Sequence, residues 1–370
     1  MSVDEEFIME ENGEQLLAWL EIDLSAIKNN IREIRRRVGQ GIAIVGVVKA
    51  DGYGLGSVEI SRVLLANGAD RLAVARFQEA MELRQAGIEA PILILGPIEA
   101  CFIGEAILHN ITQTVFNYAM AEKISLVAKS LDRQATIHLK IDTGMGRIGF
   151  LPDQASLEEA KRIFDLENIY VEGIFSHFAT ADFADKTFSD QQMATFGNFI
   201  AELTEAGQEI PFHHIANSAA IIDLPETYLN MVRPGIILYG YYPSQEVCRE
   251  NLPLCPAVTL KALITNIKKM EKNHSVGYCR NWYTTDDESL IATVPLGYAD
   301  GISRLLFPGG QALVNGERAP IVGNVCMDQL MLDISHISNA ENIKIGDEVV
   351  LVGRQKDAYI PLEELSDRMN

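Results

Sequence analysis

The chain has 370 residues, of which 48% are hydrophobic and 22% are charged, so it is globular and long enough for two domains. Its formal net charge of −20 argues against nucleic acid and an anionic membrane surface as partners, and suits a small-molecule substrate. Five scattered cysteines without a Cys-x-x-Cys pair favour reduced thiols in the cytoplasm, and we find neither a signal peptide nor an apolar run of the ~18 residues that a membrane span needs.

Residues 1–18 are rich in acidic side chains, and we expect a solvated leader there. Residues 19–24 alternate and predict a strand, and Ser25 is expected to cap a helix that runs to Val38. Strand-like and helix-like segments then alternate. The predicted strands are Ala43–Lys49, Arg71–Ala75, Ile92–Leu95, Gln113–Phe116, Ile137–Asp142, Gly173–His177, His213–Asn217 and Met231–Arg233. The predicted helices include Ser57–Asn67, Phe77–Ala86, Tyr118–Ser130, Ser156–Asp165, Asp190–Ala206 and Ser218–Leu224.

Eight strands, each followed by a helix, predict an α/β fold of the (β/α)8 TIM-barrel type over residues 19–244. A doubly wound open sheet is the alternative, but no Gly-x-Gly-x-x-Gly motif follows the first strand in the right frame. From residue 245 to 370 the pattern changes to alternating runs separated by turns, which predicts a mostly β C-terminal domain. Its expected strands are Val258–Ile267, Leu290–Pro295, Ala312–Val314, Ile321–Val325, Gln329–Ile334 and Glu348–Val352.

One lysine stands at the end of the first barrel strand. The apolar run 42–48 leads into Lys49, and glycines at positions 52, 54 and 56 allow a sharp turn close to a ligand. Burial would lower the pKa of the lysine and free a lone pair for imine formation. The alternative is a lysine that reaches solvent at a strand end beside an ordinary turn.

A second motif places His138, Lys140 and Asp142 on one face of a strand, followed by Arg147 in a glycine-flanked turn. Arg147 is positioned to bind a carboxylate, a phosphate or a phenolate oxygen through two N–H groups. The alternative is a buried ion pair between Lys140 and Asp142 with a surface arginine.

Three further barrel segments carry candidate ligand groups. His177 ends a strand, although a lone histidine there is more often a core residue than a catalyst. Ser218 begins a helix of small residues and could cradle a phosphate, next to free backbone amides at Gly235 and Ile236. The alternative for these pieces is a helix cap and a loop.

In the C-terminal domain, Tyr298 is either a buried acid–base group or an aromatic that fills a turn. Cys326 and Asp328 have no partners at metal-ligand spacing, so no metal site is predicted.

Together these stretches resemble the alanine racemase family, the barrel-type racemases that use pyridoxal phosphate. The matching segments occur in family order: Val48–Gly54, Lys140–Arg147, Ser176–Asp182, Ala216–Ala220, Arg233–Gly235, Gly297–Gly301 and Cys326–Gln329. The resemblance implies that an amino acid is the substrate and that D-alanine is supplied for peptidoglycan. It also implies that Lys49 holds pyridoxal phosphate covalently and acts as the base for the D-enantiomer. Tyr298, from the partner in a head-to-tail homodimer with shared sites, would be the base for the L-enantiomer, since racemisation needs a base on each face of the α-carbon.

The resemblance assigns the surrounding residues as well. Arg233 would face the pyridine nitrogen with His214 behind it, and the nitrogen stays unprotonated because arginine does not readily give up a proton. His177 would tune the pKa of Tyr298, and Arg147 with the Met327 amide would hold the substrate carboxylate. The implied cofactor-binding set is Lys49, Tyr53, Leu95, Arg147, His177, Asn217, Ser218, Arg233, Gly235 and Ile236. The implied supporting residues are Lys140, His214 and Asp328, and Lys140 is expected to be carbamylated.

Two departures leave the substrate open between alanine and serine. Asn324 stands where many members have arginine, and the chain ends at Asn370, before an expected tyrosine and Cys-Gly-type segment. The acidic leader is longer than in most members, as if a preceding domain had been removed, which fits the catalytic part of a membrane-anchored serine/alanine racemase of the vancomycin-resistance type.

A related decarboxylase is disfavoured because its Gly-Gly-Gly loop and acidic partner for the ring nitrogen are missing. A non-enzymatic carrier of pyridoxal phosphate on the same barrel would lack the C-terminal domain.

Overall fold

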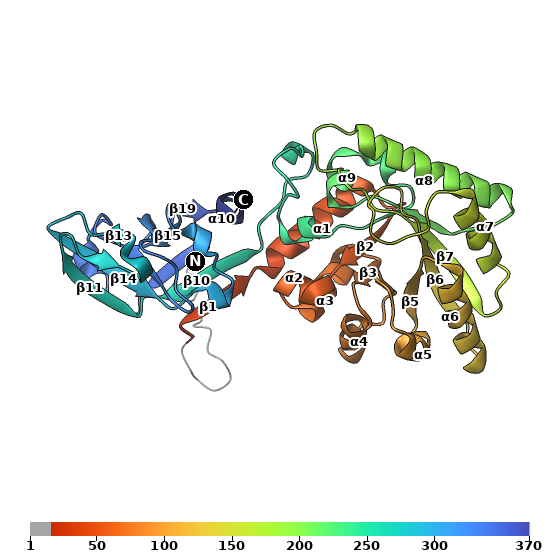
Figure 1. Cartoon of the computed structure of the whole chain (residues 1–370), viewed down its shortest axis with the longest axis horizontal. Helices are drawn as coiled ribbons and strands as arrows, with labels where there is room; N and C mark the ends of the chain where they lie inside the picture. Colours follow the sequence, from red (N-terminus) through yellow and green to blue (C-terminus); the bar gives the residue numbers. More distant parts are fainter. Residues whose placement is uncertain (1–15, 370) are drawn as a thin grey trace. The chain divides into compact units, whose positions relative to one another are not determined.

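The structure is a computed structural model that describes residues 16–369. The acidic residues 4–14 of the expected leader lie outside the described residues. The chain forms two compact units (Figure 1). One unit is Asp23–Ala257, and the other joins the residues from Val258 onward to the strand that ends at Ile22. Among the described residues, no helix has the length and apolar character needed to cross a membrane.

Eight parallel strands form a nearly closed barrel in the unit Asp23–Ala257, which confirms the predicted TIM-barrel architecture (Figure 1). From β2 to β8 each strand pairs with the next along the chain, and β2 also pairs with β9, so the opening lies between β8 and β9. The strands are β2 (Ala43–Val47), β3 (Arg71–Val74), β4 (Ile92–Ile94), β5 (Ile111–Val115), β6 (Ala135–Lys140), β7 (Ile169–Phe175), β8 (Phe212–His214) and β9 (Met231–Val232).

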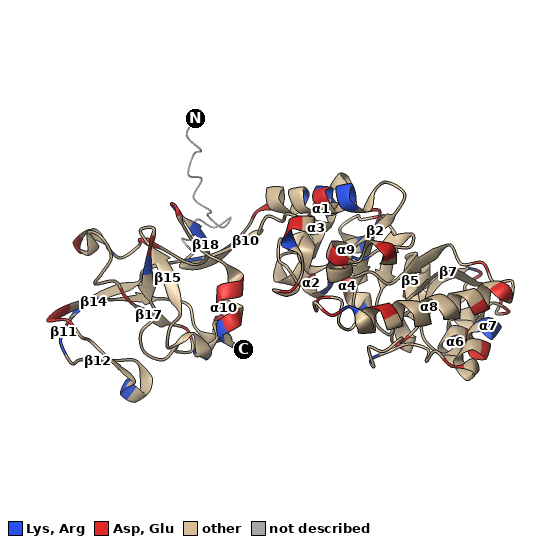
Figure 2. Cartoon of the chain, turned by 90° about the horizontal axis from the view of Figure 1, so that it is seen from above, with Lys and Arg blue, Asp and Glu red and all other residues tan. Residues whose placement is uncertain are grey.

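Helices cover the outside of this barrel, with lysine and arginine interspersed among acidic residues along them (Figure 2). They are α1 (Leu24–Val38), α2 (Lys49–Gly54), α3 (Ser57–Asn67), α4 (Phe77–Gln85), α5 (Ile103–Leu108), α6 (Tyr118–Ser130), α7 (Gln154–Ile163), α8 (Thr187–Glu205) and α9 (Ser218–Asp223). Helix α1 buries Ile27, Ile31 and Ile34 at helical spacing. The expected cap Ser25 is wrong: Asp23 caps α1, because its carboxylate accepts the N–H of Ser25 at 2.7 Å.

The barrel interior is apolar on one side and polar on the other. Val45, Val47, Ala73, Leu93 and Met231 form a buried apolar cluster contributed by β2, β3, β4 and β9. On β6 and β8 buried polar side chains face the interior instead, and these include candidate site residues described below. Because buried polar groups need hydrogen-bond partners, this half of the barrel has to be built as a connected network.

The other unit is mostly β, as predicted for the C-terminal part of the chain. Its largest sheet has the order β1-β10-β18-β15-β16, and β19 pairs with β18. The strands are β1 (Ala18–Ile22), β10 (Val258–Leu263), β11 (Asn266–Glu271), β12 (Ser275–Val276), β13 (Trp282–Tyr283), β14 (Glu288–Val294), β15 (Gln311–Val314), β16 (Glu317–Pro320), β17 (Leu330–Asp333), β18 (Glu348–Gln355) and β19 (Ala358–Ile360). Helix α10 (Leu362–Met369) follows β19.

Three expectations for this unit need correction. The strand expected over 19–24 is β1, but it pairs antiparallel with β10 and so belongs to the β unit rather than to the barrel. The run Val258–Ile267 splits into β10 and β11, which belong to different sheets. The segment Ile321–Val325 is not a strand, since it contributes the single bridge of Ile321 to Leu332, while the hairpin partner of β15 is β16.

Candidate active site

Lys49 follows the end of β2 at the start of a left-handed turn. The strand stops at Val47 rather than at Lys49 as predicted, and the half-buried Lys49 opens α2. Ala50, Asp51 and Tyr53 have φ values of 52°, 52° and 61°, a region that is costly for residues other than glycine. Hydrogen bonds hold the turn, because Glu79 Oε1 accepts the Ala50 N–H at 2.8 Å and Asp51 Oδ1 accepts an N–H of α3 at 2.7 Å. Strain held in this way is typical of functional sites.

The loop after β6 presents Arg147 through its neighbour Asp142. Asp142 Oδ1 accepts the N–H groups of Gly144 and Gly146, and its Oδ2 accepts the Arg147 N–H at 2.8 Å. Burial opposes ionisation, yet these N–H groups hold the pKa of Asp142 below its ordinary value. No ion pair joins Asp142 to Lys140 within residues 16–369, so the structural alternative for this motif does not form.

Lys140 carries a buried amine, and among the described residues no carboxylate forms an ion pair with it. Its Nζ lies 4.4 Å from the ring centroid of Phe175. Burial, reinforced by the charges of Arg233 and Arg147 and opposed by Asp142, holds the pKa of Lys140 well below its ordinary value. The amine is therefore shifted toward its neutral, nucleophilic form.

The loops after β8 and β9 form a small cradle with the ring of Tyr53. The Asn217 side chain caps α9 by accepting the Ala220 N–H, and Ser218 Oγ accepts the Gly235 N–H at 2.9 Å. The Gly235 amide is therefore not free, which corrects the sequence expectation, because the serine hydroxyl satisfies it. A Cβ on Gly235 would lie 2.6 Å from Tyr53 Oη, so a side chain there would displace the Tyr53 ring. Leu95, which follows β4, packs against the apolar cluster inside the barrel.

Arg233 follows β9 and is 3% exposed. Its guanidinium donates to the backbone oxygens of Ser176 and Ile215 at 2.8 and 3.1 Å and lies 2.6 Å from His214 Nδ1. It also reaches His177 Nδ1 at 3.3 Å. Burial, together with the charge of Arg147, lowers the pKa of Arg233 to about 9.

Positive charge gathers around His177. Burial, together with the charges of Arg233, Lys140, Arg147 and Lys49, holds the pKa of His177 well below its ordinary value. Four basic side chains from barrel strands and loops thus act on one half-buried histidine at the carboxyl ends of the strands. Such a surplus of cations favours a ligand with several anionic groups, such as phosphate, phenolate or carboxylate.

A polar network continues below Arg233 into the barrel and was not predicted. His214 Nε2 contacts His138 Nδ1 at 2.9 Å, and His138 Nε2 contacts Glu172 Oε2 at 3.1 Å. Arg71 binds both oxygens of Glu172, at 2.7 and 2.8 Å. The sequence signal that could have located Glu172 is a single carboxylate within the apolar run of β7.

Gly173 makes room for this network, and Gly173→Ala is expected to destabilise the protein. A Cβ at this position would lie 2.5 Å from Cε1 and Nδ1 of His138, whose ring is buried and hydrogen-bonded at both ends. We expect the free energy of unfolding to fall by about 1–3 kcal/mol, measured by urea denaturation. Gly197→Ala is the matched control, because its Cβ meets nothing within 4 Å in α8. The control substitution Gly197→Ala should stabilise the helix by about 0.5–1 kcal/mol. An unchanged urea midpoint for Gly173→Ala would contradict the close packing of His138 against residue 173.

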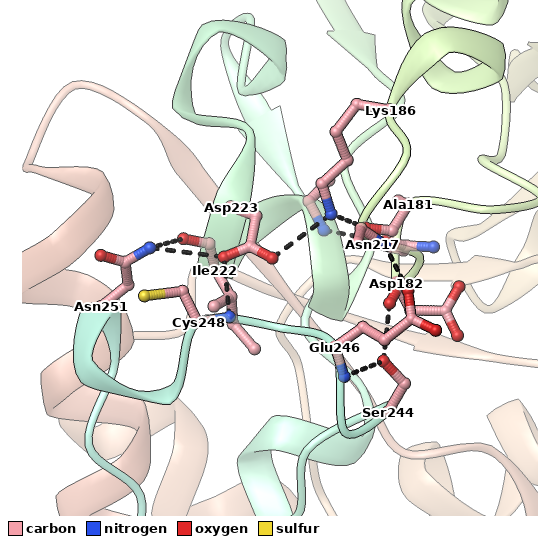
Figure 3. A network of polar contacts seen from close by, with 12 residues as sticks. Ala181, Asp182, Lys186, Asn217, Ile222, Asp223, Ser244, Glu246, Cys248 and Asn251 are labelled. Atoms are coloured by element: carbon pink, nitrogen blue, oxygen red, sulfur yellow. Dashed lines mark hydrogen bonds and ion pairs between the residues drawn. The ribbon is translucent and has the colours of Figure 1, made fainter.

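The loops that carry His177 and Ser218 are fastened by the segment after residue 243 (Figure 3). Ser244 Oγ donates to the Asp182 backbone oxygen at 2.6 Å, and Asp223 at the end of α9 accepts the Cys248 N–H at 3.2 Å. Asp223 also lies 3.3 Å from Lys186 Nζ, which donates to a backbone oxygen of the loop after β7. These bonds hold two site-bearing loops of the barrel together.

In the β unit, Tyr298 and Met327 lie on paired turns. The Tyr298 N–H donates to the Cys326 oxygen at 3.0 Å, and the Ala299 N–H donates to the Met327 oxygen at 2.8 Å. A Cβ on Gly297 would lie 2.3 Å from that Met327 oxygen, so the approach requires glycine. Tyr298 is 43% exposed and Met327 is 58% exposed. The unit therefore presents a phenol on its surface, next to the exposed Asp328.

Comparison with known proteins places both units in one family. The family models described as "Alanine racemase, N-terminal domain" and "Alanine racemase, C-terminal domain" match residues 22–243 and 257–370. The chain is 49% identical to the alanine racemase of Methanococcus maripaludis over 352 residues, which is 95% of this chain and 93% of that protein. It is 51% identical to the alanine racemase of Desulforamulus reducens over 349 residues, with 94% and 92% covered.

Solved structures give the same result. The alanine racemase of Clostridium difficile matches with a TM-score of 0.90 at 42% identity, covering 96% of this chain and 91% of that one. The alanine racemase of Bacillus anthracis, solved with bound L-Ala-P, matches with a TM-score of 0.88 at 37% identity, covering 95% and 89%.

Proposed function

Because the chain belongs to the alanine racemase family, as its motifs indicated, we propose that it interconverts L- and D-alanine with bound pyridoxal phosphate. The observation that carries the proposal is the arrangement at the barrel mouth. Lys49 stands there among Arg147, Lys140 and Arg233, whose charges converge on His177. D-Alanine for peptidoglycan is the product role that the family resemblance implies.

The residues present fit the cofactor. Its phosphate suits the cradle of Tyr53, Ser218, Gly235 and Ile236, where a side chain on Gly235 would fill the space. Asn217 shapes the same cradle as the cap of α9. When bound, pyridoxal phosphate supplies an electron-withdrawing ring that stabilises negative charge at the substrate α-carbon. Lys49 is the amine that would hold its carbonyl carbon and then move a proton on one face of the substrate.

Arg233 would limit the strength of that electron sink. An arginine donates hydrogen bonds but does not accept them and does not readily lose its proton, so a ring nitrogen facing it stays unprotonated. Burial lowers the pKa of Arg233 to about 9, which still leaves it a cation at neutral pH. A weaker sink disfavours decarboxylation and transamination, the unwanted reactions of this cofactor. Leu95 would add apolar contact beside the ring.

We propose that Tyr298 supplies the second base from the partner subunit of a head-to-tail homodimer. Racemisation needs a base on each face of the α-carbon, and Lys49 occupies one face. Tyr298 and Met327 are exposed on the β unit, which supports a role at a surface shared with a second chain. His177 Nδ1 accepts from Arg233, so its Nε2 carries the proton and can donate to a phenolate oxygen. Arg147 and the Met327 amide would hold the substrate carboxylate, with Asp328 supporting that turn.

We further propose that Lys140 is carbamylated. A neutral buried amine is required for reaction with carbon dioxide, and the depressed pKa of Lys140 provides it. The product would be an anion beside Arg147 and Arg233 in place of a neutral amine. Native mass measurement of the intact chain, with Lys140→Ala for comparison, should detect one carbamate that the variant lacks. A bare amine at Lys140 in the native protein would reject this assignment, and Lys161→Ala on the surface of α7 is the control that retains the carbamate.

The function is tested by assaying L-alanine and L-serine side by side with purified protein and pyridoxal phosphate. The proposal predicts conversion of both to their D-enantiomers at different rates, with alanine faster. A higher kcat/KM for serine would reassign the substrate to the serine type of racemase. Racemisation of neither amino acid would reject the proposed function.

A further inference from the structure

A continuous line of polar contacts runs from the bottom of the barrel interior to Arg233. Arg71 binds Glu172 through two N–H···O contacts, at 2.7 and 2.8 Å. Glu172 Oε2 lies 3.1 Å from His138 Nε2, and His138 Nδ1 lies 2.9 Å from His214 Nε2. His214 Nδ1 then lies 2.6 Å from the Arg233 guanidinium. Both histidines are at most 1% exposed, so water does not compete with these contacts.

The two ends of the line determine where each proton lies. Arg233 has no acceptor, so His214 Nδ1 must be unprotonated and the proton of His214 sits on Nε2. That N–H donates to His138 Nδ1, and so the proton of His138 also sits on Nε2. The line then ends on Glu172, which can only accept when it is ionised. Every hydrogen bond between Arg233 and the carboxylate therefore points in one direction.

The ionisation states agree with this direction. Burial holds the pKa of His138 below its ordinary value, and burial with the charge of Arg233 holds that of His214 well below it. Both rings are therefore neutral, as is required if every hydrogen bond donates in the direction from Arg233 to Glu172. Burial raises the pKa of Glu172, but the hydrogen bonds from His138 and Arg71 have the larger effect and lower the pKa to about 2. Glu172 is thus an anion throughout the ordinary pH range.

We propose that Glu172 is a positioning residue for the active site, acting through the tautomers of His138 and His214 on the orientation of Arg233. Arg71 fixes the carboxylate, the carboxylate fixes both imidazoles, and His214 Nδ1 fixes the guanidinium that would face the ring nitrogen of the cofactor. The expected effect of Glu172 on the racemisation rate rests on the proposed function. The proton positions themselves belong to this chain whatever it catalyses.

Glu172→Gln gives a test because its side chain keeps the size but adds two donors. If the amide oxygen stays toward His138, the new NH₂ group meets the N–H groups of Arg71. If the amide turns, it donates to His138, both tautomers reverse, and His214 presents Nδ1–H to Arg233. Either arrangement places two donors face to face. The double variant Arg71→Gln/Glu172→Gln removes the conflict. The side-chain oxygen of the new residue at position 71 can accept a hydrogen bond from the NH₂ group at position 172. The side-chain oxygen at position 172 then remains free to accept the His138 Nε2–H.

The experiment is ¹⁵N NMR of histidine side chains in the full-length protein, which has seven histidines. Substitution of His138 and His214 one at a time assigns their signals. The wild type should show Nε2–H and bare Nδ1 in both rings. Glu172→Gln should reverse this pattern if its amide turns and keep it if its NH₂ group faces Arg71, and the double variant should show the wild-type pattern. Steady-state assays should follow, with kcat down about 10–100-fold in Glu172→Gln and largely recovered in the double variant.

Three outcomes would overturn the proposal. One is a proton on Nδ1 of either ring in the wild type, and another is a Glu172→Gln variant that keeps both the tautomer pattern and the wild-type kcat. The third is a double variant whose kcat is no higher than that of Glu172→Gln. If Glu172 acted only through its ion pair with Arg71, the double variant would give that result. A protein that racemises no amino acid but shows the expected tautomers would reject the proposed function and leave this inference standing.

Discussion

Lys49→Ala is expected to abolish racemisation and the visible absorption of bound pyridoxal phosphate together. The variant removes the amine proposed to hold the cofactor, which is also one of the two proposed bases. Loss of the base alone should lower the rate by about 10²–10⁴-fold, and loss of the covalent attachment adds to this. The measurements are the absorption spectrum of the purified protein and the rate of D-alanine formation.

Two further variants make the result specific. Lys49→Arg keeps the positive charge in the cluster around His177 but cannot form an imine, so it should be as inactive as the alanine variant. Lys129→Ala is the control, because this lysine lies on α6 with its side chain 64% exposed and pairs with the exposed Glu167, so the change should leave both readouts unchanged. A coloured, active Lys49→Arg protein would show that charge rather than covalent chemistry is the function of this residue.

Tyr298→Phe is expected to lower removal of the α-hydrogen from L-alanine by about 10²–10⁴-fold, with a much smaller effect on its removal from D-alanine. The phenol oxygen is the only heavy atom lost, so the ring and the paired turns that carry it remain. Exchange of the α-hydrogen with deuterated water, measured separately for each enantiomer, separates the two half-reactions.

The matched control is Tyr283→Phe, which removes another exposed phenol oxygen from the same unit. It should leave exchange of both enantiomers unchanged. Equal losses for L- and D-alanine in Tyr298→Phe would argue against a separate base for each face and would assign Tyr298 a general role in binding or stability.

The barrel could be read from the sequence because its strands are buried, apolar and short. Runs such as Ile92–Ile94 are bounded by proline and glycine, and helices such as α7 between the strands bury apolar residues at helical spacing. The sequence could not predict which sheet β1 joins, because alternation of polar and apolar residues predicts a strand but not its partner. The same limit explains Ile321–Val325, where β-branched residues line the core without forming a ladder.

The candidate site divides in a similar way. Residues next to glycines or at strand ends, such as Lys49 and Arg147, stand out because local chemistry marks them. Glu172 and Arg71 did not stand out, because the two are 101 residues apart and neither lies in a recognisable motif. The pairing of His138 with His214 spans 76 residues and is created only when β6 and β8 enter one barrel. Buried networks of this kind depend on register and closure, which local patterns do not encode.

The central claim is that Lys49 of one subunit and Tyr298 of the other serve the same substrate, and mixed dimers test it directly. Lys49→Ala and Tyr298→Phe chains, each inactive alone, are unfolded together in equal amounts and refolded with pyridoxal phosphate. If the bases come from different subunits, about half of the dimers are mixed and each holds one intact site, so activity should recover to about one quarter of the wild-type value. If the mixture stays as inactive as its components while wild-type chains refold with full activity, the shared site is contradicted.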